Sequence, residues 1–556
     1  MNPDEYYERW LSRVSDMSLM LELLDIAHND AAIEDRFYRE LAFGTGGLRG
    51  LLGAGTNRMN IHTVRKATQG YADYLRSHFA EPSVAVSYDS RRNSRLFAET
   101  AAAVFAANGI AVHIYPRLMP TPALSFAVRQ LHCSGGVMIT ASHNPAEYNG
   151  YKVYGSDGCQ ITTEAADAIQ TCINAVDIFD DVKSGDYDSF LAAGRIREIP
   201  ESVSDAYLTA VASLSLAESD WKKELKLVYT PLNGAGISVV PKLLTEQGYT
   251  NFVIPEAQRE PNGDFPTCPY PNPEIRQALE LGIATAKETG SDLVLATDPD
   301  CDRVGCAVRD GDDYTLINGN EMGVLLFDYV CRRRTALGTM PAHPVAVKTI
   351  VTTPMARKIA DAYGVELRNV LTGFKYIGEQ IGYLEAEGRL DDYIFGFEES
   401  YGYLSGSHAR DKDAANAVLL ICEMACAYAR QGMSLADALR SLFALYGAYE
   451  TRLLNFSFPG SAGFARMNQL MDGLRTSPIT ELGGEKVLSR IDYLRDETGL
   501  PRSDVLRYLL PDAELVIRPS GTEPKLKVYL TLSGEDAAAC RKRCDDLEKN
   551  FDLWTK

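Results

Sequence analysis

One loop places a serine and a histidine where both could act on a phosphoryl group. Thr140-Ala-Ser142-His143-Asn-Pro145 follows the apolar run GGVMIT, which predicts a β-strand. A hydroxyl at a strand end is held rigidly, and His143 and the nearby Lys152 can move protons or balance charge. The hydrolase motif GxSxG is absent. The same residues also fit a simple Asn-Pro turn whose serine bonds its own backbone.

A second loop gathers three carboxylates, Asp298, Asp300 and Asp302, followed by Arg303. Carboxylates at alternate positions of an extended loop can converge, and neighbours about 4 Å apart repel by about 4 kcal/mol per pair near a protein surface. A divalent cation removes that repulsion, and hard oxygen ligands favour Mg²⁺. A calcium loop of the EF-hand type is excluded because Arg303 and Arg309 replace its glycine and glutamate. A solvated acidic turn is the alternative.

A third loop, Phe397-Glu398-Glu399-Ser400, follows another apolar strand. A carboxylate can accept hydrogen bonds from two adjacent hydroxyl groups, so Glu398 and Ser400 suit the diols of a sugar. The alternative interpretation of this sequence is a pair of exposed glutamates beside a helix-capping serine.

A fourth loop has the composition of an anion-binding turn. Its donors and cations are Arg518, Ser520, Gly521, Thr522 and Lys525. The glycine permits a turn whose N–H groups point inward, the hydroxyls add donors, and the cations add charge. A plain turn between strands is the alternative.

Two further segments add positive charge. The glycine-rich stretch 43–50 contains Arg49 but lacks the GxGxxG pattern after a strand, so it does not indicate a dinucleotide site. Thr372, Gly373 and Lys375 form a turn that could hold a second phosphate or could be an ordinary strand-to-helix connection.

The composition describes a folded, acidic protein. The 556 residues carry 56 basic and 75 acidic side chains, a formal charge of −19. Such an excess repels phosphate backbones and anionic lipid headgroups, so nucleic acid and membranes are not expected as partners. An anionic substrate would have to be held by a few basic loops. No apolar leader or long apolar run occurs, and we expect a cytoplasmic protein.

The order of predicted elements favours an α/β fold. Strand–helix–strand patterns recur at 83–115, 226–254 and 345–370, which implies parallel pairing in three related α/β domains. The segment from about residue 446 predicts strands around a loop and a final helix, a smaller α+β lid. We therefore expect mixed, largely parallel sheets around a central cleft, in domains at 1–203, 204–318, 319–445 and 446–556. Each α/β domain would place one functional loop at the carboxyl end of its strands.

The ordered set TASHNP, DPDCDR, FEES and RPSGTEP, with GTGGLRG before it and HARDKD after the sugar loop, resembles the α-D-phosphohexomutase family over nearly the whole chain. The resemblance implies that Ser142 carries a phosphoryl group and that Mg²⁺ is bound by Asp298, Asp300, Asp302 and the phosphoserine oxygen. It implies that Arg49, His143, Lys152 and Arg303 surround the transferring group. The general base stays open among His143, Lys152 and Lys412.

The resemblance also implies a substrate site. Sugar hydroxyls would meet Glu398 and Ser400, and the non-reacting phosphate would meet Arg518, Ser520, Gly521 and Thr522. Further substrate-binding residues would be Thr372, Gly373, Lys375, Lys412 and Lys525. Cys301 departs from the small or varied residues usual at its position in the metal loop, and its side chain is expected to point away.

The implied reaction interconverts glucose 1-phosphate and glucose 6-phosphate through glucose 1,6-bisphosphate, which would also activate the enzyme. The partners would be small sugar phosphates, and the chain would be a monomer or a weak homodimer. The sequence FEESYGYL differs from the E-x-S-G-H loop of the mannomutase and glucosamine-mutase branches, and pentose or mannose phosphates are alternative substrates. More distant alternatives are an aspartyl-nucleophile phosphatase and a non-catalytic sugar-phosphate binding protein.

Overall fold

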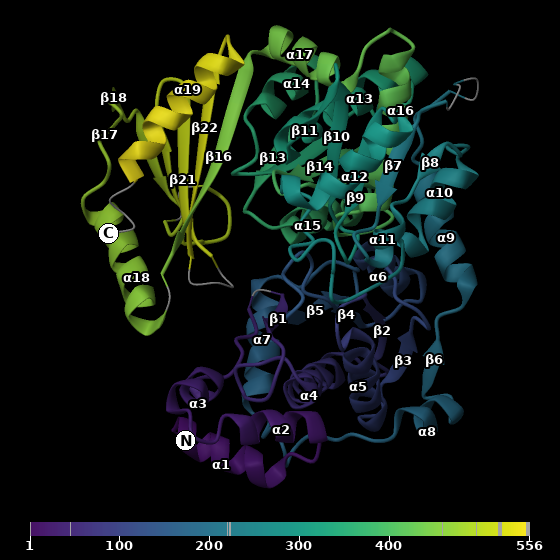
Figure 1. The fold of residues 1–556 in the computed structure, drawn as a ribbon, viewed down its shortest axis with the longest axis vertical. Coiled ribbons are helices and arrows are strands. Elements are labelled where there is room, and N and C mark those ends of the chain that lie inside the picture. Colours follow the sequence, from purple (N-terminus) through teal and green to yellow (C-terminus); the bar gives the residue numbers. More distant parts are fainter. Residues whose placement is uncertain are drawn as a thin grey trace.

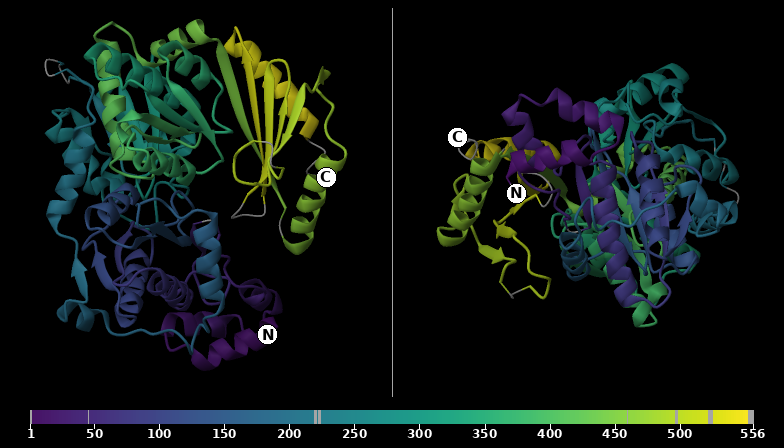
Figure 2. Two further views of the ribbon diagram at one scale, coloured as in Figure 1. Left: turned by 180° about the vertical axis from the view of Figure 1, so that it is seen from behind. Right: turned by 90° about the horizontal axis from the view of Figure 1, so that it is seen from below.

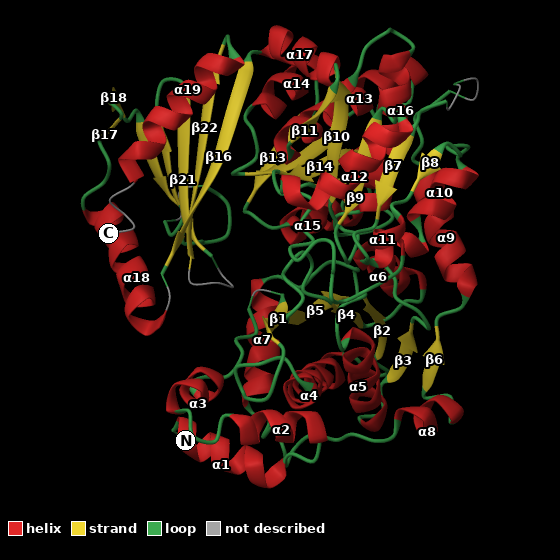
Figure 3. Cartoon of the chain, viewed as in Figure 1, coloured by secondary structure: helices red, strands yellow, loops and turns green. Residues whose placement is uncertain are grey.

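The structure is a computed structural model that describes residues 2–44, 46–218, 221, 224–458, 460–495, 498–520 and 525–551. Within these residues, four larger sheets and one two-stranded sheet follow one another along the chain (Figures 1 and 3). The first three larger sheets mix parallel and antiparallel pairs, and the fourth is antiparallel. The predicted fold class, three α/β units and a C-terminal α+β unit, is confirmed.

The first sheet carries the serine loop between β4 and β5. Its strand order is β1-β5-β4-β2-β3-β6. Strand β2 pairs in parallel with β3, as the strand–helix–strand pattern predicts, and also with β4. Helices α4, α5 and α7 pack on one face, and α6 and α9 on the other. The strands are β1 Gly47–Leu51, β2 Ser83–Tyr88, β3 Ala111–Ile114, β4 Gly135–Ile139, β5 Tyr148–Gly155 and β6 Ile196–Glu198. The helices are α1 Pro3–Arg13, α2 Met17–Asp25, α3 Asp30–Phe37, α4 Ile61–His78, α5 Ser94–Ala107, α6 Thr121–Gln130, α7 Thr163–Asn174, α8 Tyr187–Ala192 and α9 Glu201–Ala212.

The second sheet carries the acidic loop between β9 and β10, which form an antiparallel hairpin. Its order is β11-β10-β9-β7-β8. The strands are β7 Leu227–Thr230, β8 Phe252–Val253, β9 Leu293–Thr297, β10 Val304–Asp310 and β11 Asp313–Ile317. The helices are η1 Ala235–Ser238, α10 Val240–Glu246, α11 Glu256–Arg259 and α12 Arg276–Thr289.

The third sheet, in the order β13-β12-β14-β15, carries the sugar-loop motif. Here β14 extends to Glu398, so the motif begins inside the strand and not after it. The strands are β12 Val345–Thr349, β13 Glu366–Val370, β14 Tyr393–Glu398 and β15 Gly402–Leu404. The helices are α13 Gly319–Leu337, α14 Met355–Tyr363, α15 Phe374–Ala386, η2 Leu390–Asp392, α16 Ala414–Ala429 and α17 Leu435–Tyr446.

The fourth sheet has the order β16-β22-β21-β20-β19, and a small hairpin, β17 and β18, lies beside it. The predicted loop between two strands joins β21 to β22, and the predicted final helix is α19. The strands are β16 Ala448–Ser457, β17 Glu481–Leu482, β18 Glu485–Lys486, β19 Ser489–Asp492, β20 Leu506–Leu509, β21 Ala513–Pro519 and β22 Lys525–Gly534. The helices are α18 Gly460–Thr476 and α19 Ala537–Glu548.

The apolar cores show which parts are joined firmly. One continuous cluster of buried side chains includes Met138, Leu295 and Phe395, one from each of the first three sheets. The fourth sheet packs on its own core with α18 and α19 and meets the third unit through a small cluster that includes Val351 and Tyr529. Figure 2 shows this sheet standing apart from the N-terminal unit. A unit attached by so few apolar contacts can move more easily than the other three.

Each larger sheet lies inside one of the four predicted domain ranges, although the exact boundaries stay a prediction. Among the described helices, none combines the length and the apolar character needed to cross a lipid bilayer.

Candidate active site

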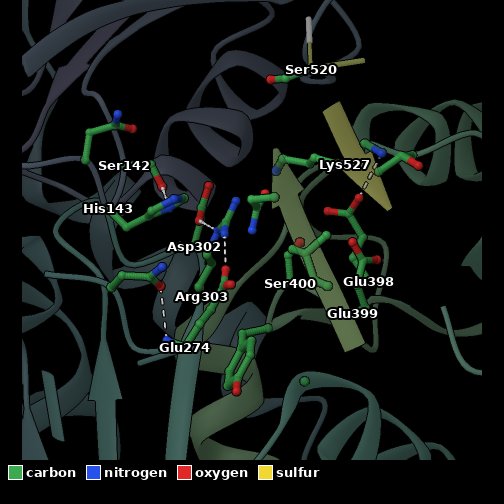
Figure 4. Close-up of a pocket in the computed structure, with 18 of the residues that line it drawn as sticks. Ser142, His143, Glu274, Asp302, Arg303, Glu398, Glu399, Ser400, Ser520 and Lys527 are labelled. Carbon is green, nitrogen blue, oxygen red and sulfur yellow. Dashed lines mark hydrogen bonds and ion pairs between the residues drawn. The ribbon is translucent and has the colours of Figure 1, made fainter. Parts of the chain in front are cut away.

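All four units contribute to one large cleft with a volume of about 1010 Å³ (Figure 4). The three α/β units contribute loops at the carboxyl ends of their strands, which is where open α/β sheets bind ligands. The sequence-predicted residues that line it are Arg49, Ser142, His143, Lys152, Asp302, Arg303, Thr372, Gly373, Glu398, Ser400, Lys412, Arg518, Ser520 and Lys525. The structure therefore brings together loops that are hundreds of residues apart.

Ser142 faces the acidic loop. Its Oγ donates to Asp298 Oδ2 at 2.8 Å and lies 3.3 Å from Nδ1 of His143. Its backbone has a φ of +53°, a left-handed conformation that is uncommon for a residue with a side chain. Its N–H donates to Thr140 Oγ1 at 2.8 Å, which fixes this turn. The hydroxyl is thus held directly beside the three carboxylates by a strained turn.

The three carboxylates form a buried cluster. Asp298, Asp300 and Asp302 each offer an oxygen within 4.8 Å of the others, and each side chain is at most 1% exposed. Within the described residues, Asp300 Oδ1 and Asp302 Oδ1 accept no hydrogen bond. Burial and the two neighbouring carboxylates raise the pKa of Asp298 well above its usual value. Clustered, mutually repelling carboxylate oxygens that lack hydrogen bonds suit a divalent cation, so this cluster could bind a metal ion.

Two lysines face the same cluster. Lys152 Nζ donates to Asp300 Oδ2 at 2.7 Å and to Asp302 Oδ2 at 3.3 Å, and Lys412 Nζ lies 3.1 Å from Asp302 Oδ2. Burial alone would lower the pKa of each lysine, but the carboxylates opposite raise it above the ordinary value. Both ammonium groups are therefore charged, and they offset part of the negative charge of the cluster.

His143 has the opposite electrostatic environment. Burial, followed by the charges of Arg303 and Arg49, holds its pKa well below the ordinary value. Arg49 lies on β1 and donates to the side chain of Asn144 at 3.0 Å. A neutral imidazole next to a serine hydroxyl can accept a proton, whereas the two charged lysines cannot.

The sugar-loop motif faces the cleft from the third sheet. Glu398 is 4% exposed and accepts the N–H of Gly373 at 2.9 Å. Burial, opposed by the charge of Lys412, raises the pKa of Glu398 to about 7. Gly373 has a φ of +120°, which favours glycine at this turn. Glu398 and Ser400 therefore present an acceptor and a hydroxyl to the same part of the cleft (Figure 4), which Thr372 also lines.

The basic turn of the fourth unit faces the cleft from the other side. Arg518, Ser520 and Lys525 line it, and the N–H of Ser520 donates to the carbonyl of Lys525 at 2.7 Å. Gly521 and Thr522 lie outside the described residues. Lys527 on β22 adds a further cation that the sequence motifs do not include. This concentration of charge is what an anionic ligand requires in an acidic protein.

Lys375 does not line the large cleft. It lines a smaller adjoining cavity of about 170 Å³ together with Arg49 and Lys152. Burial lowers its pKa to about 8.

Two other residues contact the acidic loop but were not predicted from the sequence. Thr121, at the start of α6, donates its hydroxyl to Asp300 Oδ2 at 2.8 Å and its N–H to the Asp300 carbonyl at 2.9 Å. Glu274 accepts from Arg303 Nη1 at 2.5 Å. Both lie in proline-containing segments, PTP and PNPE, that give no local sign of a distant partner. Thr121 reaches the acidic loop only because the first and second units pack together, and Glu274 reaches it through the fold of the second unit itself.

Comparison with known proteins gives matches in all four units. Models of the phosphoglucomutase/phosphomannomutase family match residues 40–178 (alpha/beta/alpha domain I), 205–311 (domain II), 318–446 (domain III) and 467–547 (C-terminal domain). The chain is 37% identical to the phosphoglucomutase of Staphylococcus saprophyticus over 510 residues, 89% of this chain and 91% of the relative. It is 36% identical to that of Staphylococcus aureus over 539 residues, 94% of this chain and 95% of the relative.

A solved structure has the same fold. The putative phosphomannomutase of Thermus thermophilus superposes with a TM-score of 0.70 at 24% identity, covering 92% of this chain and 99% of the other. The chain is thus an enzyme of the mutase class, which belongs to the isomerases. It belongs to the phosphoglucomutase/phosphomannomutase family, that is, to the α-D-phosphohexomutases.

Proposed function

We propose that this enzyme interconverts glucose 1-phosphate and glucose 6-phosphate through a phosphorylated Ser142. The observation that carries the proposal is the 2.8 Å hydrogen bond from Ser142 Oγ to Asp298, within a buried group of three carboxylates. A serine on a strained turn beside a potential cation site suits a phosphoryl carrier. The choice of glucose is supported by the name of the staphylococcal relatives.

The residues of the cleft have different roles in phosphoryl transfer. The bond between phosphorus and Ser142 Oγ breaks and a bond from phosphorus to O6 of glucose 1-phosphate forms. The proton of the O6 hydroxyl passes to a base, and the released Ser142 Oγ takes up a proton to become a hydroxyl again. His143, 3.3 Å from Ser142 Oγ, is the residue we assign as this base, because Lys152 and Lys412 are held by carboxylates. Arg303 and Arg49 balance the charge of the moving group. Bound Mg²⁺, which Asp298, Asp300 and Asp302 would hold, supplies charge neutralisation at the phosphoryl oxygens.

The opposite side of the cleft holds the phosphate that does not react. Arg518, Ser520 and Lys525 would grip that phosphate, while Glu398 and Ser400 would fix the sugar ring between the two ends. Glucose 1,6-bisphosphate would then turn over and return its other phosphoryl group to Ser142. A unit that is attached to the rest by few apolar contacts can open and close for this step.

Intact-protein mass spectrometry tests the phosphoryl carrier directly. Incubation of the Mg²⁺-loaded protein with glucose 1,6-bisphosphate should add one phosphoryl group, and peptide mapping should place it on Ser142. A phosphoryl group on Asp298 would instead favour an aspartyl-nucleophile phosphatase. Folded, metal-loaded protein that takes no label and produces no glucose 6-phosphate would favour a binding protein.

Substrate choice is expected to depend on Glu398. Loss of a hydrogen-bonding partner of a buried hydroxyl costs about 1–3 kcal/mol, so Glu398→Ala should lower kcat/KM for glucose 1-phosphate by about 5- to 150-fold. We expect a smaller loss for ribose 1-phosphate, whose ring presents fewer hydroxyls. Steady-state kinetics with glucose, mannose and ribose 1-phosphates measures both effects.

Arg518→Ala serves as the matched comparison for this test. It should weaken all three substrates by a similar factor, because the distal phosphate is common to them. Equal losses for Glu398→Ala across the three sugars would show that this residue does not select the substrate.

A further inference from the structure

The loop after β2 contains two buried charged residues that the proposed mechanism does not use. Asp89 and Arg91 are 2% and 3% exposed, and they form an ion pair, Arg91 Nε to Asp89 Oδ2, at 3.4 Å. Neither lines the cleft among the described residues. In the sequence both residues belong to the polar segment DSRRNS, residues 89–94. Burying two charges is costly unless many hydrogen bonds compensate, so their partners indicate their role.

Arg91 is bonded to the main chain of the serine loop. Its guanidinium donates to the carbonyls of Ser142 and Asn144, to that of Pro145 at 2.9 Å and to that of Tyr148 at 3.1 Å. One planar side chain thus satisfies four carbonyls from the loop after β4 and from the first residue of β5. A lysine has the charge but not the rigid fork of donors that this arrangement needs.

Asp89 reaches the same loop by a different route. It accepts the hydroxyl of Thr140 at 2.6 Å, and Thr140 Oγ1 in turn accepts the N–H of Ser142 at 2.8 Å. The Ser94 hydroxyl donates to the other Asp89 oxygen at 2.7 Å. The N–H and the carbonyl of Ser142 are therefore both held by the Asp89–Arg91 pair. These two contacts matter because the φ of +53° at Ser142 is strained, and a strained backbone conformation persists only where surrounding contacts hold it.

The pair also connects the serine loop to the second unit. The ring of Phe265 lies 5.2 Å from the guanidinium carbon of Arg91, and Gly263 forms a β-bridge with Arg91. A Cβ on Gly263 would come within 2.4 Å of the N of Arg92, so the close approach requires glycine. Asp298, the acceptor of the Ser142 hydroxyl, belongs to this second unit. The contact therefore helps to fix the position of Ser142 relative to the acidic cluster.

We propose that Asp89 and Arg91 are positioning residues of phosphoryl transfer, which hold the Ser142 turn in the geometry that the reaction requires. The proposal rests on the proposed function, since it assumes that Ser142 carries the phosphoryl group. Phosphoryl transfer depends on positioning and charge neutralisation, and a shift of about 1 Å at the reacting atom can cost about 100-fold in rate.

The test compares Arg91→Lys with Arg92→Lys. Arg92 lies next in the same loop, is half exposed and pairs with Asp264, so the control makes the same change of side chain without touching the serine loop through that side chain. Arg91→Lys should lower kcat for glucose 1-phosphate by about 100-fold and slow the labelling of Ser142 by glucose 1,6-bisphosphate by a similar factor. KM should change less than about threefold, because the substrate contacts stay in place. Arg92→Lys should match the wild type.

A purely structural role gives a different result. Arg91→Lys would then lower the melting temperature but leave kcat and the labelling rate of the folded fraction within about threefold of wild type, and the proposal would be wrong. If Arg91→Lys does not fold, Thr140→Val removes only the hydroxyl between Asp89 and Ser142, and a folded Thr140→Val with wild-type kcat would equally overturn it. Wild-type protein without labelling or turnover would contradict the proposed function itself, which separates the two failures.

Discussion

Ser142→Ala is expected to reduce mutase turnover by about 10⁴-fold or more and to abolish labelling by glucose 1,6-bisphosphate. The reason is that Ser142 is the hydroxyl bonded to Asp298, and the nearby Thr121 hydroxyl is already committed to Asp300. Without the carrier, the two half-reactions have no shared intermediate on the protein. A coupled assay for glucose 6-phosphate and intact-protein mass measure the two effects.

The fold should survive this change. The substitution removes the hydrogen bond from Ser142 to Asp298, which is worth about 1 kcal/mol, and leaves the rest of the carboxylate cluster unchanged. Ser156→Ala is the matched control, because Ser156 lies exposed in the turn after β5. Its kinetics and labelling should equal those of the wild type. A Ser142→Ala variant that keeps a tenth of the wild-type turnover would exclude Ser142 as the obligatory carrier.

The sequence predicts well those features that depend on local pattern. The run SVAVSY predicts a strand at 83–88, and β2 has these same bounds. The agreement is good because helices cover both faces of this strand and bury nearly all of its residues. The polar loops after GGVMIT and SDLVLA also lie where expected, at strand ends facing the cleft. FEES is displaced, since Phe397 and Glu398 still pair with β15 and so belong to the strand.

The remaining parts of the site depend on tertiary packing. Arg91, Thr121 and Glu274 each act on a partner about 30 to 180 residues away, and nothing in their own segments indicates this. The sequence also leaves the charge state of the lysines open. Lys152 and Lys412 are fixed as cations only because the packing places both against Asp302.

The strongest test of the metal cluster is Asp300→Asn, which we expect to lower turnover by about 10³-fold while the protein stays folded. The amide oxygen introduced at position 300 can still accept the hydrogen bond from the Thr121 hydroxyl. Lys152 Nζ keeps its hydrogen bond to Asp302 Oδ2 at 3.3 Å. Removing one charge also reduces the repulsion between Asp298 and its neighbouring carboxylates. The lost activity would therefore reflect the cation site and not a general loss of structure.

Thermal melting with and without Mg²⁺ provides a readout that does not depend on turnover. A cation that binds only the folded state at about 100 times its Kd raises the free energy of unfolding by about 2.7 kcal/mol, so the wild type should melt at a higher temperature when Mg²⁺ is added. Asp300→Asn should lose most of that rise. Asp312→Asn, an exposed carboxylate in the turn between β10 and β11, should keep all of it. An Asp300→Asn variant with wild-type turnover and an undiminished response to Mg²⁺ would reject the three aspartates as the metal site, because a cation bound elsewhere would not depend on the charge at position 300.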